Sequence, residues 1–223
     1  MRVSVSLWSA DLLALGVAMD RVEHVVDGFH IDVMDGRFAP ELVFGPDVAR
    51  AVRGRTRRLV DVHLMVEEAD RWIGPFAEAG AGMLTVHAAS CPDVAATLAR
   101  IGALGVRPAI AVGVDDPLEP LHELLSQVDR VLLMGTRLGV RGVDIEPSIY
   151  ERIRTVVGWR ERVARRPEVF IDGGIRRHTV PLIARAGTDG VTPGSLIFGE
   201  ADPAAAVTWI AAHPPISPRG EHG

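Results

Sequence analysis

Short apolar runs rich in β-branched residues alternate with amphipathic stretches along the whole chain. The runs predict strands, and the stretches between them repeat apolar positions every three to four residues, which predicts helices. The predicted strands lie at residues 2–7, 28–34, 58–64, 82–87, 107–112, 129–134, 168–172 and 189–192. The predicted helices lie at 11–26, 46–53, 68–79, 93–104, 117–126, 146–163, 177–186 and 202–212. This alternation is typical of an α/β protein, a single (β/α)8 TIM barrel.

Two of the predicted strands carry polar side chains within apolar runs. At every second position, and therefore on one face of each strand, lie His30, Asp32 and Met34 in one run and Asp61, His63 and Met65 in the other. A histidine and a carboxylate that face the interior are costly unless something pairs with them. A divalent metal would do so, and this ligand set suits Zn, Mn, Fe or Co. A further carboxylate, Asp172, follows late in the chain.

The barrel prediction places these polar side chains together, because active sites of TIM barrels lie at the carboxyl ends of the strands. The residues at or just past the predicted strand ends are Ser6, His30, Asp32, Met34, His63, Met65, His87, Met134 and Asp172. We expect one catalytic domain at 1–212. The remaining segment, 213–223, is rich in Pro, Gly and charge, and we expect it to be a poorly ordered tail.

Composition narrows the function. The chain has 223 residues and a net charge of -5, which argues against nucleic acid as a partner. No apolar run approaches the ~20 residues that span a bilayer, and the first residues lack a signal-peptide core, so we expect a cytoplasmic protein. Cys91 is the only cysteine, and we interpret it as structural. All 24 cationic side chains are arginine, which excludes an aldolase that forms a Schiff base through lysine.

Several motifs, taken in order, resemble the ribulose-phosphate 3-epimerase family over nearly the whole domain. They are Ser6-Leu-Trp-Ser-Ala-Asp11, His30-Ile-Asp-Val-Met-Asp-Gly-Arg-Phe-Ala-Pro40, Asp61-Val-His-Leu-Met-Val66, Thr85-Val-His87, Asp172-Gly-Gly-Ile175 and Gly194-Ser-Leu-Ile-Phe-Gly199. The resemblance implies a barrel of the ribulose-phosphate-binding type. It also implies a metal-dependent isomerase that inverts carbon 3 of a ketose phosphate, with D-ribulose 5-phosphate and D-xylulose 5-phosphate as the leading pair.

The same resemblance assigns the site residues. The metal ligands would be His30, Asp32, His63 and Asp172, and the two aspartates would also transfer the protons through an enediolate. The residues expected to bind substrate are Ser6, Met34, Met65, Met134, Gly142, Gly173, Gly174, Gly194 and Ser195. Ser195 would begin a short helix that faces the phosphate. The family also implies a homo-oligomer, although the sequence identifies no interface.

The loop after the sixth predicted strand departs from the family. Its sequence, Met134-Gly-Thr-Arg-Leu-Gly-Val-Arg-Gly-Val143, lacks the family's Pro, Phe and Gln and introduces Arg137 and Arg141. Either arginine would reach a phosphate or be a solvated loop charge. In the family this loop covers the substrate, so its changed sequence leaves another ketose phosphate such as allulose 6-phosphate, or a non-catalytic barrel that binds sugar phosphate, as an alternative. A lyase resembling hexulose-phosphate synthase would need a lysine that the chain lacks.

Other residues keep two interpretations. Ser6 either binds substrate or satisfies a strand end, His87 either supports the site or is structural, and the methionines either line the site or fill the core. Asp35 is expected to orient the loop before Gly36. The cluster Arg176-Arg177-His178 lies beside the Gly-Gly turn and would extend the phosphate site.

Overall fold

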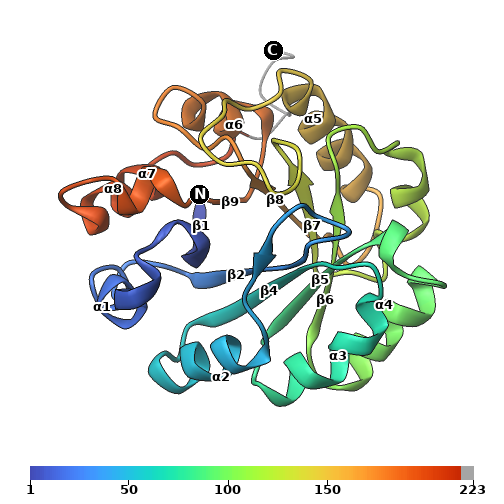
Figure 1. The fold of residues 1–223 in the computed structure, drawn as a ribbon. Coiled ribbons are helices and arrows are strands. Elements are labelled where there is room, and N and C mark those ends of the chain that lie inside the picture. The colour runs from blue at the N-terminus through green and yellow to red at the C-terminus, as the bar shows by residue number, and fades with distance from the viewer. Residues whose placement is uncertain (217–223) are drawn as a thin grey trace, which may run out of the picture.

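The computed structural model describes residues 1–216 and shows a closed barrel of parallel strands ringed by helices (Figure 1). Within that range the parallel strands are β1 (Arg2–Ser6), β2 (Gly28–Asp35), β4 (Leu59–Met65), β5 (Met83–His87), β6 (Arg107–Val112), β7 (Arg130–Met134), β8 (Glu168–Asp172) and β9 (Gly190–Thr192). Each pairs with the next, and β1 pairs with both β2 and β9, which closes the ring. The predicted TIM barrel is therefore confirmed.

The helices form the outer layer of the barrel. They are α1 (Leu15–Asp20), α2 (Pro46–Arg55), α3 (Ala69–Glu78), α4 (Val94–Ala103), α5 (Ile149–Arg160), α6 (Val180–Ala186), α7 (Ser195–Phe198) and α8 (Pro203–Ala211). The four-residue helix α7 begins at Ser195, as predicted. Two further helices start at aspartates that accept a hydrogen bond from the first turn, Asp93 before α4 and Asp202 before α8.

The prediction of a helix at 117–126 is wrong. This segment forms only the 3-10 helix η4 (Glu119–Glu123). Pro120 explains the difference, because a proline at the fourth position of an α-helix has no N–H for the carbonyl of residue 116 and its ring clashes there. The predicted helix at 11–26 is likewise shorter and divides into the 3-10 helix η2 (Leu12–Ala14) and α1.

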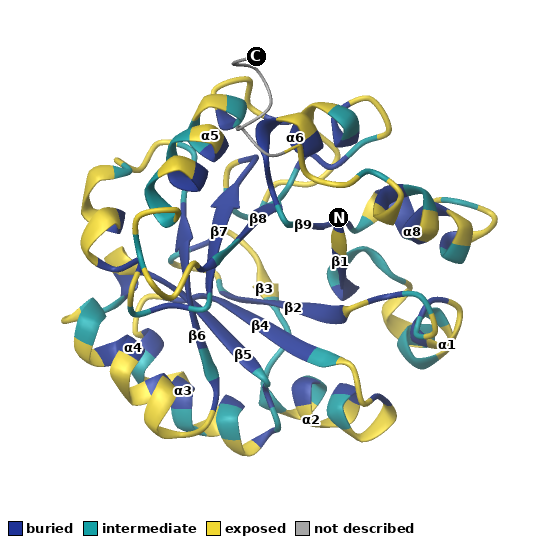
Figure 2. Cartoon of the chain, turned by 180° about the vertical axis from the view of Figure 1, so that it is seen from behind, coloured by how far each residue is buried: buried dark blue, intermediate teal, exposed yellow. Residues whose placement is uncertain are grey.

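Alternation along the strands separates two apolar regions. One set of side chains packs outward against the inner faces of the helices, as Val60, Val62 and Leu64 of β4 do. The other set points into the barrel, where Leu132, Met134 and Phe170 form a smaller cluster. Figure 2 shows the strands buried and the outer helix faces exposed. The polar positions of β2 and β4 share the interior with this smaller cluster.

Two smaller features complete the fold. The two-residue strand β3 (Leu42–Val43) pairs antiparallel with the end of β2, and it was not predicted. The amino group of Met1 donates to the carbonyls of Ala211 and His213, and the Ile216 amide donates to Ala184. Residues 217–223 of the predicted tail lie outside the described residues. In residues 1–216 no helix has the length and apolarity needed to cross a membrane.

Candidate active site

Four predicted ligands meet at the carboxyl end of the barrel. His30 and Asp32 come from β2, His63 from β4 and Asp172 from β8, and one potential ligand atom of each lies within 4.8 Å of all the others. Parallel register explains part of this convergence, because Asp32 stands opposite His63. The strand framework therefore brings together residues that are up to 142 positions apart in the sequence.

These residues fit a metal ion. The Nε2 atom of His30 and the Nδ1 atom of His63 are buried and have no hydrogen-bond partner within residues 1–216. The His30 nitrogen lies 3.5 Å from Asp32 Oδ1, and the His63 nitrogen lies 3.8 Å from Asp172 Oδ2. Two imidazole nitrogens and two carboxylate oxygens around a common centre match a divalent transition metal, whose bonds to such atoms are about 2.0–2.2 Å. The prediction of a site for Zn, Mn, Fe or Co is therefore supported by the geometry.

The rest of each histidine ring is also engaged. His30 Nδ1 lies 3.1 Å from Asp61 Oδ2, and His63 Nε2 lies 2.8 Å from His87 Nε2. Phe38 packs against the His87 ring, with centroids 5.1 Å apart. For His63 Nδ1 to offer a lone pair, its Nε2 must carry the hydrogen and His87 must accept it. His87 thus supports His63 from behind.

The electrostatics agree with this hydrogen bonding. Burial works to lower the pKa of His30, but the carboxylates of Asp61 and Asp32 raise it well above the usual value. Burial likewise works to lower the pKa of His63, but the nearby carboxylates of Asp172 and Asp32 raise it above the usual value. In contrast, burial and the neighbouring His63 hold the pKa of His87 well below its usual value. His87 is therefore neutral near pH 7, as an acceptor requires.

Asp32 is held in a defined orientation. Ser6 Oγ donates to its Oδ2 at 2.7 Å, which leaves Oδ1 facing the two histidines. Burial acts to raise the pKa of Asp32, but His30 and His63 keep it well below the usual range. Ser6 thus contacts Asp32, and its binding of substrate stays a prediction.

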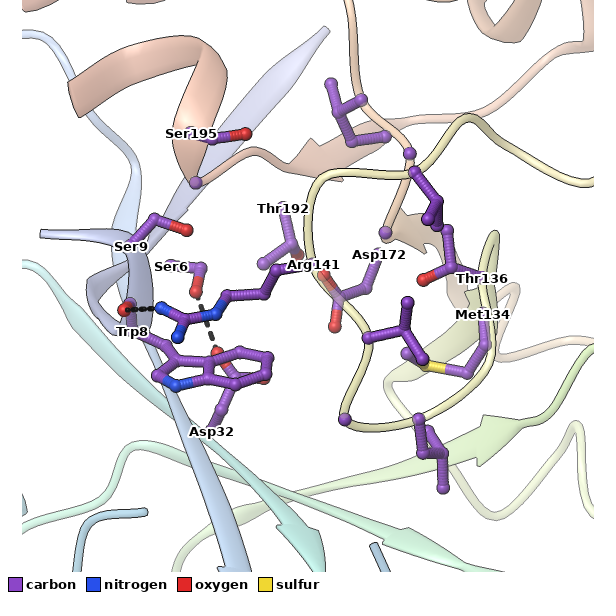
Figure 3. A pocket seen from close by; sticks show the side chains of 18 of the residues that line it. Ser6, Trp8, Ser9, Asp32, Met134, Thr136, Arg141, Asp172, Thr192 and Ser195 are labelled. Atoms are coloured by element: carbon purple, nitrogen blue, oxygen red, sulfur yellow. Dashed lines mark hydrogen bonds between the residues drawn. The ribbon is translucent and has the colours of Figure 1, made fainter. Parts of the chain in front are cut away.

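A pocket opens above the four residues (Figure 3). Asp32 and Asp172 lie at its floor, whereas the two histidines are buried beneath it. Every residue predicted to bind substrate lines it, namely Ser6, Met34, Met65, Met134, Gly142, Gly173, Gly174, Gly194 and Ser195. The three methionines are nearly buried, so they serve as both wall and core.

Glycine is required at the far end of the pocket. Gly173 and Gly174 follow β8 with φ of +88° and +70°, a region that other residues rarely adopt. A Cβ atom on Gly194 would lie 2.3 Å from Ser9 Oγ. The backbone can therefore approach a ligand closely at this end.

The loop arginines have different partners. Arg137 pairs with Asp115 at 3.1 Å, and both side chains are exposed. Arg141 stacks on Trp8, with its Cζ 4.4 Å from the ring centre, and donates to the Trp8 carbonyl. Figure 3 shows its side chain reaching across the pocket toward Trp8.

The three side chains of the predicted cluster Arg176-Arg177-His178 also have different partners. Arg177 pairs with Glu200, and His178 lies 3.5 Å from Asp144. Arg176 instead lines the pocket and donates to Ser195 Oγ at 3.0 Å.

Several pocket residues were not singled out from the sequence, among them Trp8, Thr136 and Thr192. Thr192 could have been found, because it stands two positions before Gly194 on the inward face of β9, in register with Asp172. The prediction for Asp35 is confirmed, because it accepts hydrogen bonds from the amides of Arg37, Phe38 and Glu67 and so orients its loop. Cys91 contacts Ser90 and the His87 carbonyl, burial raises the pKa of its thiol, and its structural role stays a prediction.

Comparison with known proteins assigns this chain to a family. Residues 2–198 match the family model described as the ribulose-phosphate 3 epimerase family. The chain belongs to this family. As a family member it is an isomerase that acts on carbohydrates, specifically a ketose-phosphate 3-epimerase.

Individual relatives match this chain over nearly their full length. The ribulose-phosphate 3-epimerase of Bacillus subtilis is 36% identical over 211 residues, which cover 94% of this chain and 97% of the relative. The ribulose-phosphate 3-epimerase of Synechocystis is 31% identical, with 93% and 92% covered. The solved structure of 3-hexulose-6-phosphate synthase from Salmonella typhimurium has a TM-score of 0.70 over 95% of this epimerase and 97% of that chain. At 22% identity, the last comparison shows only the shared fold.

Proposed function

We propose that this epimerase interconverts D-ribulose 5-phosphate and D-xylulose 5-phosphate, with Asp32 and Asp172 as its acid and base. The observation that carries the proposal is a pocket with two carboxylates at its floor and, buried beneath them, two histidine nitrogens that have no hydrogen-bond partner within residues 1–216. Inverting a carbon next to a ketone requires removing a proton from one side and returning one on the other. Two carboxylates on separate strands, β2 and β8, suit that requirement.

The reaction balances within the pocket. One aspartate takes the proton from carbon 3, the C–H electrons move toward the ketone, and an enediolate forms. The other aspartate, which carries a proton when the substrate binds, then donates that proton to carbon 3 on the opposite face. His30, Asp32, His63 and Asp172 would hold a divalent cation, whose positive charge would stabilise the enediolate. Ser6 holds Asp32 in place at 2.7 Å, and the apolar side chains of Met34, Met65 and Met134 limit access of water.

We further propose that Arg141 and Arg176 bind the phosphate. Both line the pocket, and neither has a carboxylate partner among residues 1–216. Their contacts are with neutral carbonyl and hydroxyl groups, so the positive charges remain available. Two uncompensated guanidinium groups beside Gly173, Gly174 and Gly194 favour a phosphate dianion. Arg137 does not belong to this set, because Asp115 already neutralises it.

Solvent exchange tests the proposal. The metal-loaded enzyme in deuterium oxide is given each ketose phosphate, and deuterium at carbon 3 is followed by NMR. Exchange and epimerisation of ribulose 5-phosphate are expected. Asp32→Asn and Asp172→Asn should each abolish epimerisation, and each should retain exchange with a different epimer, because one base still faces it.

The controls separate chemistry from metal loss. The metal content of both variants is measured, and Asp47→Asn, an exposed change at the start of α2, should behave as wild type. Exchange with allulose 6-phosphate alone would retain the mechanism and replace the substrate. Bound metal without exchange of any ketose phosphate would contradict the proposal and favour a non-catalytic barrel.

A further inference from the structure

A second group of ionised side chains lies beneath the four ligands. It consists of Asp61 on β4, Arg130 at the start of β7 and Glu168 at the start of β8. Arg130 is 2% exposed and Asp61 is 1% exposed, so both charges are inside the barrel. Burying an ion pair is costly, and apolar side chains of similar size often serve stability equally well. This pair therefore calls for a role beyond packing.

Arg130 is fixed on three sides. Its Nη1 donates to Asp61 Oδ2 at 2.6 Å, and its Nη2 and Nε donate to Glu168 Oε2 at 2.9 and 3.2 Å. Its Cζ lies 3.6 Å above the centre of the Phe170 ring. A planar guanidinium held by two carboxylates and an aromatic face has little freedom to rotate.

Asp61 connects this anchor to the metal site. The oxygen that accepts from Arg130, Oδ2, also lies 3.1 Å from His30 Nδ1. An ionised carboxylate only accepts hydrogen bonds, so Nδ1 must carry the hydrogen. His30 Nε2 is then left with its lone pair toward Asp32 and Asp172. Ser4 Oγ, at 3.5 Å, is too distant to hold Asp61 alone.

We propose that Arg130 is a positioning residue for the metal. By fixing Asp61, it fixes the tautomer and orientation of His30, although it touches neither the ligand atoms nor the pocket. The inference rests on the metal site of the proposed function. Groups that orient a ligand histidine in this way typically change metal affinity by about 10- to 100-fold.

A double-mutant cycle in metal affinity tests this role. Zn²⁺ affinity is measured by competition with a chromophoric chelator for wild type, Arg130→Met, Asp61→Asn and the double variant. Each single change should weaken binding by about 10- to 100-fold. The double variant should be no weaker than Asp61→Asn alone, because Arg130 acts through Asp61. Arg107→Met is the matched control, since Arg107 reaches Glu168 at 3.7 Å but does not contact Asp61.

Melting of the metal-free variants separates positioning from stability. Arg130→Met leaves Asp61 buried without its partner and should lower the Tm, and the double variant should recover part of this loss while still binding Zn²⁺ weakly. Arg130→Lys keeps the positive charge but not the planar guanidinium, so its Zn²⁺ affinity should be intermediate. This variant replaces Arg130→Met in the test if Arg130→Met does not fold. Wild-type affinity in the Arg130 variants, or losses that add in the double variant, would overturn the inference. Failure of wild type to bind Zn²⁺ would instead overturn the metal site itself.

Discussion

The assignment of Arg176 to the phosphate leads to a quantitative prediction. An arginine has five N–H donors. In this structure three are used, all on neutral acceptors: the carbonyls of Ile175 and Val143 and the hydroxyl of Ser195. Two N–H groups therefore remain for an anion. A hydrogen bond to a charged group contributes about 1.5–3 kcal/mol.

Replacing Arg176 with glutamine should remove at least one such bond. At 1.4 kcal/mol for each tenfold change, kcat/KM for ribulose 5-phosphate should fall roughly 10- to 150-fold. The assay compares this substrate with unphosphorylated ribulose, whose much slower exchange at carbon 3 should not change. A loss confined to the phosphorylated substrate identifies phosphate binding.

Two neighbours provide the controls. Arg177→Gln removes an arginine that pairs with Glu200, and Arg137→Gln removes one that pairs with Asp115. Both should retain kcat/KM within a few-fold. If Arg176→Gln slowed the two ribulose substrates equally, or if Arg177→Gln were as damaging, the phosphate role of Arg176 would be refuted.

Three other predictions follow from the structure. Carboxylates raise the pKa values of His30 and His63, so Zn²⁺ affinity should fall as the pH is lowered, starting above the ordinary histidine pKa. Competition with a chelator between pH 6 and 9 measures this dependence, and an affinity that does not change with pH would contradict it. Gly194→Ala should raise KM for ribulose 5-phosphate, since its Cβ would displace Ser9 at the pocket rim, with unchanged KM as the contrary result. Gly158 lies in the last turn of α5, and an added Cβ would have nothing within 4 Å. Gly158→Ala should therefore stabilise the fold, by at most about 0.5–1 kcal/mol in thermal melts, and a lower Tm would count against this account.

The metal group could be predicted from the sequence because its members lie on strands. The two-residue repeat of a strand places His30 and Asp32 on one face, and buried parallel strands leave little choice of which face is inward. Parallel pairing then sets Asp32 opposite His63. The predicted ends of these strands differ from the observed ends by about one residue at most, so the sequence located the carboxyl edge of the barrel.

The loop after β7 could not be resolved in the same way. It has no apolar repeat, and in the sequence Arg137 and Arg141 are equivalent basic residues. Their difference comes from contacts with distant segments, Asp115 for one and Trp8 for the other. Arg176 was likewise inseparable from Arg177 by sequence alone. The partner of a long charged side chain depends on which distant segments the fold brings close to it.

The balance of charges inside the barrel explains why Arg130 is buried there. Glu168 is neutralised at the outer end of the barrel, where it contacts Arg2 and Arg107. The interior then contains three carboxylates and one guanidinium, a sum of -3 + 1 = -2, from Asp32, Asp61, Asp172 and Arg130.

A divalent ion brings that sum to zero when both ligand histidines are neutral and both active-site aspartates are ionised. In the metal-free protein, the neighbouring carboxylates raise the pKa values of His30 and His63, which favours protons on both rings. Metal binding should therefore release protons from these histidines. Without Arg130 either state would retain an uncompensated buried carboxylate, which explains why a cation lies so far below the ligands.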